Sequence, residues 1–499
     1  MILPVPFRLK AYKPNRRFIM HPHPARLIPL KCRVHLRRDR GWVDGITKWS
    51  RLVAAIGLFW PVWSQALPSF ARQTNMSCIA CHTSYPELTP FGRQFKLSGY
   101  TLSTGESNLP PLAIMLQPSF TYTEKPQAGG AAPGFQPNDN YATTQASFFY
   151  AGRILGPYAG DLLSPDAAAF ANKIGVFLQT TYDGVAKTWS WDNAEVRYAS
   201  TGSLGEHTAT YGFYANNNPT MQDPWNSTPA WGYPFTSSGL APGPAATTLL
   251  DGGFAQQVAG AGGYAMFDNT LYLDLAGYHT IGSHLQKSLG VDPDGEAQIS
   301  GVAPYWRVAL ERPLGNATLE LGTFGLATDT RPGRDGSAGE DRVLDLGFDS
   351  QYQLAFGKND ISAAASWIYE RQTWVASNAL GNTSNPFDSL RSLKLTLHYL
   401  RDKTYGLTVQ YFSVGGDADA ALYPDSASGS PNSNGAIFQF DYLPFNKGGG
   451  PAFWPRSNVK ISLQYVAYAK FDGARTNYDG AGTNARDNNT LYLETWIVF

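Results

Sequence analysis

Five consecutive residues, Cys78-Ile79-Ala80-Cys81-His82, carry the side chains in this sequence best suited to redox chemistry. Two thiols separated by two residues can add across the vinyl groups of a porphyrin, and an imidazole directly after the second thiol can bind the iron. The motif therefore predicts one covalently attached c-type haem. Cys78 and Cys81 are the expected thioether donors, and His82 is the expected proximal iron ligand.

Two other uses of closely spaced cysteines fit this sequence less well. A thioredoxin-like dithiol accompanies a βαβ pattern, which is absent around Cys78, and a zinc site needs a second Cys or His pair nearby. The only other cysteine, Cys32, lies in a basic leader. Disulfide scaffolds and zinc ribbons are therefore excluded for the exported chain.

The sixth iron ligand is left open by the sequence. Met115 is the candidate distal ligand, because Met76 lies too close to Cys78 to reach the opposite haem face without strain. An open or water-bound site is the alternative. The exported chain has four further histidines, which are more typical of barrel or loop positions: His207, His279, His284 and His398.

An export signal precedes the motif. Lys48 and Arg51 stand before the apolar run 52–62, which is followed by Ser64-Gln65-Ala66. A basic stretch, a short apolar run and a small-x-small site are typical of a secretory signal peptide. We assign it to residues 48–66, since the run is shorter than the roughly 20 residues that span a bilayer. Haem of the c type is attached outside the cytoplasm, which agrees with export.

Residues 1–47 are rich in Pro and Arg and show no periodicity. We hypothesise that this basic leader is not translated and that synthesis starts at Val43; a precursor peptide N-terminal to Val43 would exclude this. The first 51 residues hold 13 of the 39 Lys and Arg but only two of the 39 Asp and Glu. The exported chain then has a net charge of about −11, which argues against nucleic-acid binding and is compatible with cationic ligands.

From Leu112 onward the chain reads as strands and turns, and no helix is predicted. Apolar and polar residues alternate in Leu393–Tyr399 and Val459–Tyr465, and a period of two places the two sets on opposite faces of a sheet. A soluble antiparallel sandwich or propeller would alternate in the same way. The all-β fold class is therefore predicted, and other features must decide between barrel and sandwich.

Three features favour an outer-membrane antiparallel β-barrel over residues 111–499. The strand number is even, and the chain ends in an aromatic residue, Phe499. From the fifth strand on, long connections alternate with tight turns, with one exception, the Gly/Pro-rich stretch Pro444–Pro455. The phase of the turns places both termini in the periplasm. The 16 candidate strands start near Leu112, Tyr141, Lys173, Thr188, His207, Gly253, Thr270, Tyr305, Ala317, Arg342, Asp360, Leu390, Tyr405, Gly435, Asn458 and Asn489.

The alternation of apolar and polar residues also predicts which face of the sheet each residue occupies. In the last strand, Glu494 is expected in the lumen, whereas its apolar neighbours Leu491, Leu493, Ile497 and Phe499 are expected to face lipid. Other predicted lumen residues are Glu195, Arg197, Asp274, Arg307, Glu311, Glu320, Asp345, Asp349 and Lys394. The haem segment, residues 67–110, is short for a free-standing domain. We expect it to fill part of the lumen at the periplasmic mouth.

Residues 71–100, ARQTNMSCIACHTSYPELTPFGRQFKLSGY, resemble the N-terminus of the fused monohaem cytochrome–porins, an outer-membrane iron-oxidase family. The resemblance implies that Cys78, Cys81 and His82 carry the haem. It also implies an Fe(II)-oxidising electron-transfer protein that takes electrons from extracellular Fe(II), or another donor, and passes them to a periplasmic carrier such as a soluble cytochrome or a cupredoxin. A diffusion porin with a haem-bearing plug and a periplasmic haem peroxidase remain as alternatives.

Overall fold

The computed structural model describes residues 68–104, 108–229, 236–292, 297–447, 449–452 and 457–499. The basic leader with Cys32 and Val43, and the signal peptide, lie outside the described residues. None of the helices in the described ranges is long and apolar enough to cross a membrane.

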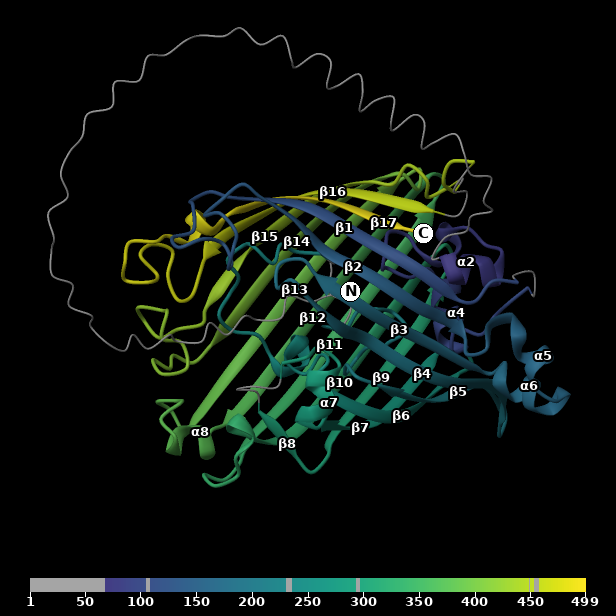
Figure 1. Cartoon of the computed structure of the whole chain (residues 1–499), viewed down its shortest axis with the longest axis horizontal. Helices are drawn as coiled ribbons and strands as arrows, with labels where there is room; N and C mark the ends of the chain where they lie inside the picture. The colour runs from purple at the N-terminus through teal and green to yellow at the C-terminus, as the bar shows by residue number, and fades with distance from the viewer. Residues whose placement is uncertain (1–67, 105–107, 230–235, 293–296, 448, 453–456) are drawn as a thin grey trace, which may run out of the picture. The chain divides into compact units, whose positions relative to one another are not determined.

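The strands form one antiparallel sheet in which β17 pairs back with β1, so that the sheet closes into a barrel (Figure 1). Their bounds are β1 Leu112–Thr123, β2 Asn140–Arg153, β3 Ile174–Asp183, β4 Thr188–Leu204, β5 His207–Asn216, β6 Val258–Phe267, β7 Leu271–Thr280, β8 Gln298–Ser300, β9 Ala303–Leu314, β10 Ala317–Arg331, β11 Asp341–Phe356, β12 Asn359–Thr373, β13 Phe387–Arg401, β14 Tyr405–Gly416, β15 Ser433–Tyr442, β16 Asn458–Lys470 and β17 Thr490–Val498.

The three-residue β8 is the first part of β9 rather than a separate strand. Both pair with β10, and Gly301, with a φ of +76°, interrupts the ladder between them. Such a break suits glycine, which adopts positive φ without a steric penalty. The barrel therefore has 16 strands, which confirms the predicted number. Two predicted starts are clearly displaced. The strand predicted to start near Tyr305 begins at Gln298 once β8 is counted with β9, and a tight turn over Leu249–Gly253 delays β6 to Val258.

The faces of the sheet follow the predicted alternation. On β17, Tyr492, Glu494 and Trp496 are buried inside the barrel, whereas Leu493 is 41% exposed on the outer face. On β14 the outward Leu407 is 52% exposed. An apolar outside and a polar inside are the reverse of a soluble protein, and they exclude a soluble sandwich. The predicted lumen residues lie inside as expected, most of them almost completely buried.

The two ends of the barrel differ. One end, called the tight-turn end below, carries the short connections 205–206, 315–316, 357–358 and 402–404. Figure 1 shows α2 and the C-terminus at this end. The opposite, loop end carries most of the long connections, among them the β5–β6 connection, whose described residues 217–229 and 236–257 reach into the lumen.

Short helices in the connections correct the prediction that no helix follows Leu112. They are α5 Ala159–Leu162, α6 Pro165–Ala171, α7 Ser283–Ser288 and α8 Ala376–Ala379. Each has at most two turns, which is too short to show a helical period in the sequence. On α6, Phe170 stacks on Tyr198 of β4 with ring centroids 5.6 Å apart.

Candidate haem-attachment site

The Cys-x-x-Cys-His motif lies on α3, Cys78–Cys81, between α2, Pro68–Thr74, and α4, Pro90–Leu97. α3 is a single helical turn, and the His82 N–H closes it by donating to the Cys78 carbonyl at 2.9 Å. One turn brings residues three apart to the same side of the helix, so that both thiols can reach one planar group.

α4 holds this turn in place. Thr89 caps α4 by accepting from the Gly92 N–H at 3.1 Å, and its own hydroxyl donates to the Ala80 carbonyl at 2.6 Å. The close approach requires glycine at position 92, since a Cβ there would collide with the Cys81 carbonyl. The sequence Thr89-Pro90-Phe91-Gly92 thus starts a helix and packs it against the haem motif.

The motif lies at the edge of the buried part of the segment. Residues 75–77 are exposed, residues 78–82 are half-buried and residues 83–88 are buried. A large planar group can therefore contact both cysteines from the open side without displacing the buried residues.

The two thiols are not an activated redox pair. Burial raises the pKa of Cys81 to about 12, with a further contribution from nearby Cys78, and burial also raises the pKa of Cys78. Reactive dithiols have lowered pKa values. The local environment thus disfavours the thioredoxin-like alternative that the spacing alone permits.

His82 fits the role of an iron ligand. Burial lowers its pKa to about 4, against the opposing effect of the backbone at Glu87 and Pro86, so the ring is neutral at pH 7. Neutral imidazole is the form that binds metals. Its Nδ1 is buried, with no hydrogen-bond partner in the part of the chain that the structure describes. Tyr85 packs edge-on against the ring, with centroids 5.7 Å apart.

An apolar cluster adjoins the motif. Cys78 packs against it, and its buried members include Met115, Tyr85, Trp496 and Leu443. Met115 points inward from β1 and is 3% exposed, whereas Met76 is exposed at the surface. The two thiols, the neutral imidazole and this apolar wall fit a covalently bound haem. The assignment of Met115 as distal ligand stays a prediction.

The other four histidines have different surroundings. His207 pairs with Asp268 at 2.6 Å on the surface, and His279 contacts the Gly301 carbonyl at 2.5 Å. His284 is exposed on α7, and His398 faces Glu87 at 3.3 Å. Within the described ranges, no group of three or more His, Cys, Asp or Glu side chains could hold a metal ion.

Buried charges fix the segment inside the barrel. Arg93 on α4 forms an ion pair of 2.8 Å with Glu311 on β9 and donates to Gln353 on β11 at 2.7 Å. Lys96 donates to Asn226 at 2.8 Å and to the Asp223 carbonyl at 2.5 Å, both in the β5–β6 connection. These contacts join the haem segment to the wall and to the connection at once.

Further contacts surround the segment. Tyr100 donates to Glu195 on β4 at 2.9 Å, and Arg197 donates to the Lys96 carbonyl at 2.9 Å. On the opposite wall, Lys460 of β16 donates to the Tyr85 carbonyl at 3.3 Å and lies 4.7 Å above the Trp496 ring. The partners Gln353, Lys460 and Trp496 lie near the tight-turn ends of their strands. The segment therefore occupies that end of the lumen.

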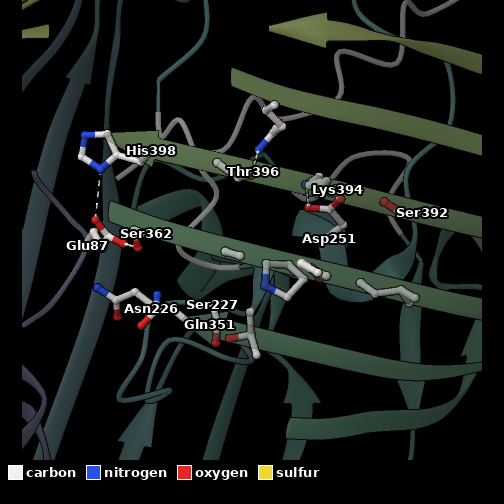
Figure 2. A pocket seen from close by; sticks show the side chains of 17 residues that line it. Glu87, Asn226, Ser227, Asp251, Gln351, Ser362, Ser392, Lys394, Thr396 and His398 are labelled. Carbon is white, nitrogen blue, oxygen red and sulfur yellow. Dashed lines mark hydrogen bonds and ion pairs between the residues drawn. The ribbon is translucent and has the colours of Figure 1, made fainter. Parts of the chain in front are cut away.

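A polar pocket continues from the segment into the lumen (Figure 2). Glu87 and His398 stand at one end, and the ion pair of Lys394 with Asp251, at 2.7 Å, stands at the other. The pocket lies between the β11–β14 wall and the β5–β6 connection. Hydroxyl and amide groups form most of the remaining lining: Asn226, Ser227, Thr228, Gln351, Ser362, Ser366, Ser392, Thr396 and Gln410.

Sequence reasoning missed the residues that dock the segment. Glu87, Arg93 and Lys96 are charged residues in a short segment between the motif and the first strand. Their charge and position could have indicated that they dock the segment. Their partners could not be named, because they lie more than 100 residues away along the chain.

Comparisons with known proteins concern the fold. No family model matches the chain, and no curated protein matches it. The chain is similar in structure to an anion-selective porin from Comamonas acidovorans at 13% identity, with 78% of this chain and 98% of that chain covered and a TM-score of 0.42. It is also similar to OmpF of Salmonella typhi in complex with daunomycin, at 12% identity, coverages of 78% and 97%, and a TM-score of 0.40. An in-vitro folded outer-membrane protein OmpT of Vibrio cholerae matches at 8% identity, coverages of 78% and 96%, and a TM-score of 0.39.

Proposed function

We propose that this chain is an outer-membrane c-type cytochrome that moves electrons across the outer membrane, with extracellular Fe(II) as donor. The observation that carries the proposal is the position of the haem motif. The motif is part of a segment anchored inside a closed barrel by buried ion pairs, such as Arg93 with Glu311. A redox group held there is fixed relative to both ends of the barrel.

The outer surface supports insertion in a membrane. Apolar side chains such as Phe213 and Leu275 are exposed on the outside, at 65% and 69%, while charged side chains lie inside. This distribution suits a lipid environment and is costly in water. In the proposed orientation the tight-turn end, with the haem motif, faces the periplasm.

The two ends of the lumen suit different partners. Because the motif is half-buried, a periplasmic carrier could approach a haem attached to Cys78 and Cys81. The polar pocket and the net negative charge of the exported chain favour a small cationic donor at the loop end. A bound haem supplies one site that accepts and releases a single electron. The chain holds the imidazole of His82 neutral and places Tyr85 and Trp496 beside the motif.

The test uses proteoliposomes that carry the haem-loaded protein and an oxidised cytochrome inside. Added external Fe(II) should reduce the internal cytochrome, one electron for each Fe(II) oxidised. A His82→Ala variant is the matched control and should show no reduction. Failure with Fe(II) but success with another donor would remove only the iron assignment. Ion conductance in planar bilayers without electron flow would instead favour the diffusion porin, and recovery of the protein in the soluble periplasmic fraction would favour the peroxidase.

A further inference from the structure

Two carboxylates face each other inside the barrel without a cationic partner. Asp345 on β11 and Glu370 on β12 are directly opposite in the antiparallel register, and both are at most 3% exposed. Like charges in such a pair destabilise a sheet, and burial removes the water that would screen them. No Lys, Arg or His in the described part of the chain forms an ion pair with either.

The β5–β6 connection approaches both carboxylates from the lumen. The Leu250 N–H donates to Asp345 Oδ2 at 2.7 Å, and the Leu249 N–H donates to Glu370 Oε2. The side-chain amide of Gln372 donates to the second oxygen of Glu370. Three donors thus serve two carboxylates, and no donor to Asp345 Oδ1 lies in the residues that the structure describes.

Three oxygens of these two strands and of the connection lack a hydrogen-bond partner in the described residues. Asp345 Oδ1, Gln372 Oε1 and Thr248 Oγ1 are all buried and have no hydrogen-bond partner in the described ranges. Gln372 Oε1 is beside Glu370, because the nitrogen of the same amide contacts that carboxylate. Thr248 directly precedes the amides that bind the two carboxylates. Leaving such acceptors unpaired in a buried site costs free energy.

In the described part of the chain the surroundings supply no cation to the pair, and the two carboxyl groups lie within hydrogen-bond reach of each other. Leu250 and Ile368 belong to one apolar cluster, and Leu390 and Tyr423 belong to another. The ammonium group of Lys394, which contacts Asp251 of the connection, is already bound by both oxygens of that carboxylate, at 2.7 and 2.9 Å. A positive charge that binds only oxygen would satisfy the site.

We propose that Asp345 and Glu370, together with Gln372 and Thr248, bind one Ca²⁺ ion that fastens the β5–β6 connection to the barrel wall. Carboxylate and amide oxygens are the ligands of Ca²⁺, which accepts irregular geometry and high coordination numbers. Mg²⁺ demands a regular octahedron and keeps its waters, and softer metals prefer nitrogen and sulfur. The ion holds the connection across the lumen, next to the polar pocket.

The test measures bound Ca²⁺ on the full-length, haem-loaded protein in detergent after treatment with EGTA. In equilibrium dialysis the wild-type protein should bind one more Ca²⁺ than the double variant Asp345→Asn/Glu370→Gln, which keeps the shape of both side chains. CaCl2 should raise the melting temperature of the wild-type protein more than MgCl2 does, and it should not change that of the double variant. Asp335→Asn, a change at an exposed loop carboxylate, is the control and should bind as the wild type does.

Equal Ca²⁺ binding by the wild type and the double variant would overturn the proposal. A melting temperature that does not respond to CaCl2 would also overturn it, and would indicate that the two carboxyls share a proton. If the double variant does not fold, Gln372→Leu tests the same point, since it retains both carboxylates but removes one oxygen ligand. It should weaken Ca²⁺ binding about tenfold or more, and an unchanged affinity would contradict the proposed ligand set.

Discussion

Arg93 and Glu311 form the ion pair that most directly joins the haem segment to the barrel. The Arg93 Nε lies 2.8 Å from Glu311 Oε2, and both side chains are largely buried, at 3% and 15% exposure. Glu311 also accepts from the indole N–H of Trp225 in the β5–β6 connection. One carboxylate of β9 therefore holds two inserted elements at once.

Replacing Arg93 by Met should loosen the haem segment while the barrel stays closed. Removing one partner leaves the Glu311 charge buried and unpaired, a change that typically costs about 3–5 kcal/mol. The urea midpoint for protease cleavage within residues 68–104 should fall, while the heat-dependent gel mobility of the barrel stays the same. Arg342→Ala, which breaks an exposed pair with Asp329, is the control and should cost less than about 1 kcal/mol. Equal midpoints for Arg93→Met and the wild type would contradict the role of this pair.

Gly92→Ala should impair haem attachment, because the added Cβ collides with the Cys81 backbone. Overpacking of this kind costs about 1–3 kcal/mol. The ratio of bound haem to protein in purified samples should fall. Gly160→Ala on α5 is a matched control, since a Cβ at that position meets no atom within 4 Å. Full haem content in Gly92→Ala would show that α4 does not need to lie so close to α3.

Met115→Leu tests the predicted distal ligand. Leucine preserves volume but lacks sulfur, so stability should change by less than about 1.5 kcal/mol while the haem spectrum and reduction potential change. Met266→Leu provides the comparison, since Met266 is also inward-facing and almost completely buried but belongs to another apolar cluster. Spectra of Met115→Leu that match those of the wild type would exclude Met115 and favour an open or water-bound site.

Docking of the haem segment should strengthen as pH rises above about 7. Burial lowers the pKa of Lys96 from 10.5 to about 7, against the opposing charge of Asp223. Below pH 7 the lysine is charged in both the docked and the unfolded chain, so the full penalty of burying the charge applies. Between about pH 7 and 10.5 only the unfolded chain binds the proton, and stability therefore increases with pH.

The measurement is the urea midpoint for release of the segment at several pH values between 6 and 9.5. The rise should disappear in Lys96→Met, which cannot titrate. A rise of equal slope in that variant would assign the effect to other groups.

The sequence predicts the barrel well because a barrel is built from local information. The period of two in Leu393–Tyr399 fixes the faces of β13, and turns such as Asp402-Lys403-Thr404 fix where it ends. The haem motif is equally local, since three residues within five positions define it. Thr89 and Gly92, which position the motif, follow a familiar helix start.

The interior could not be predicted in the same way. Arg93 meets Glu311 and Gln353, and Lys96 meets Asn226, only because barrel closure brings distant segments together. The alternation assigns Asp345 to the lumen face and leaves Glu370 unassigned. Their direct opposition depends on the register between β11 and β12. Register is set by turn geometry and pairing across the whole sheet, which no short pattern encodes.

The way the haem segment is anchored sets an order of events in biogenesis. Its binding partners come from β4, β9, β11, β16 and the β5–β6 connection, which meet only after the barrel has closed. Until then the segment has few partners to pack against, so Cys78 and Cys81 would remain accessible for the proposed haem attachment. If the chain has the proposed function, haem attachment would therefore precede barrel closure, and the closing barrel would enclose a segment that already carries its cofactor.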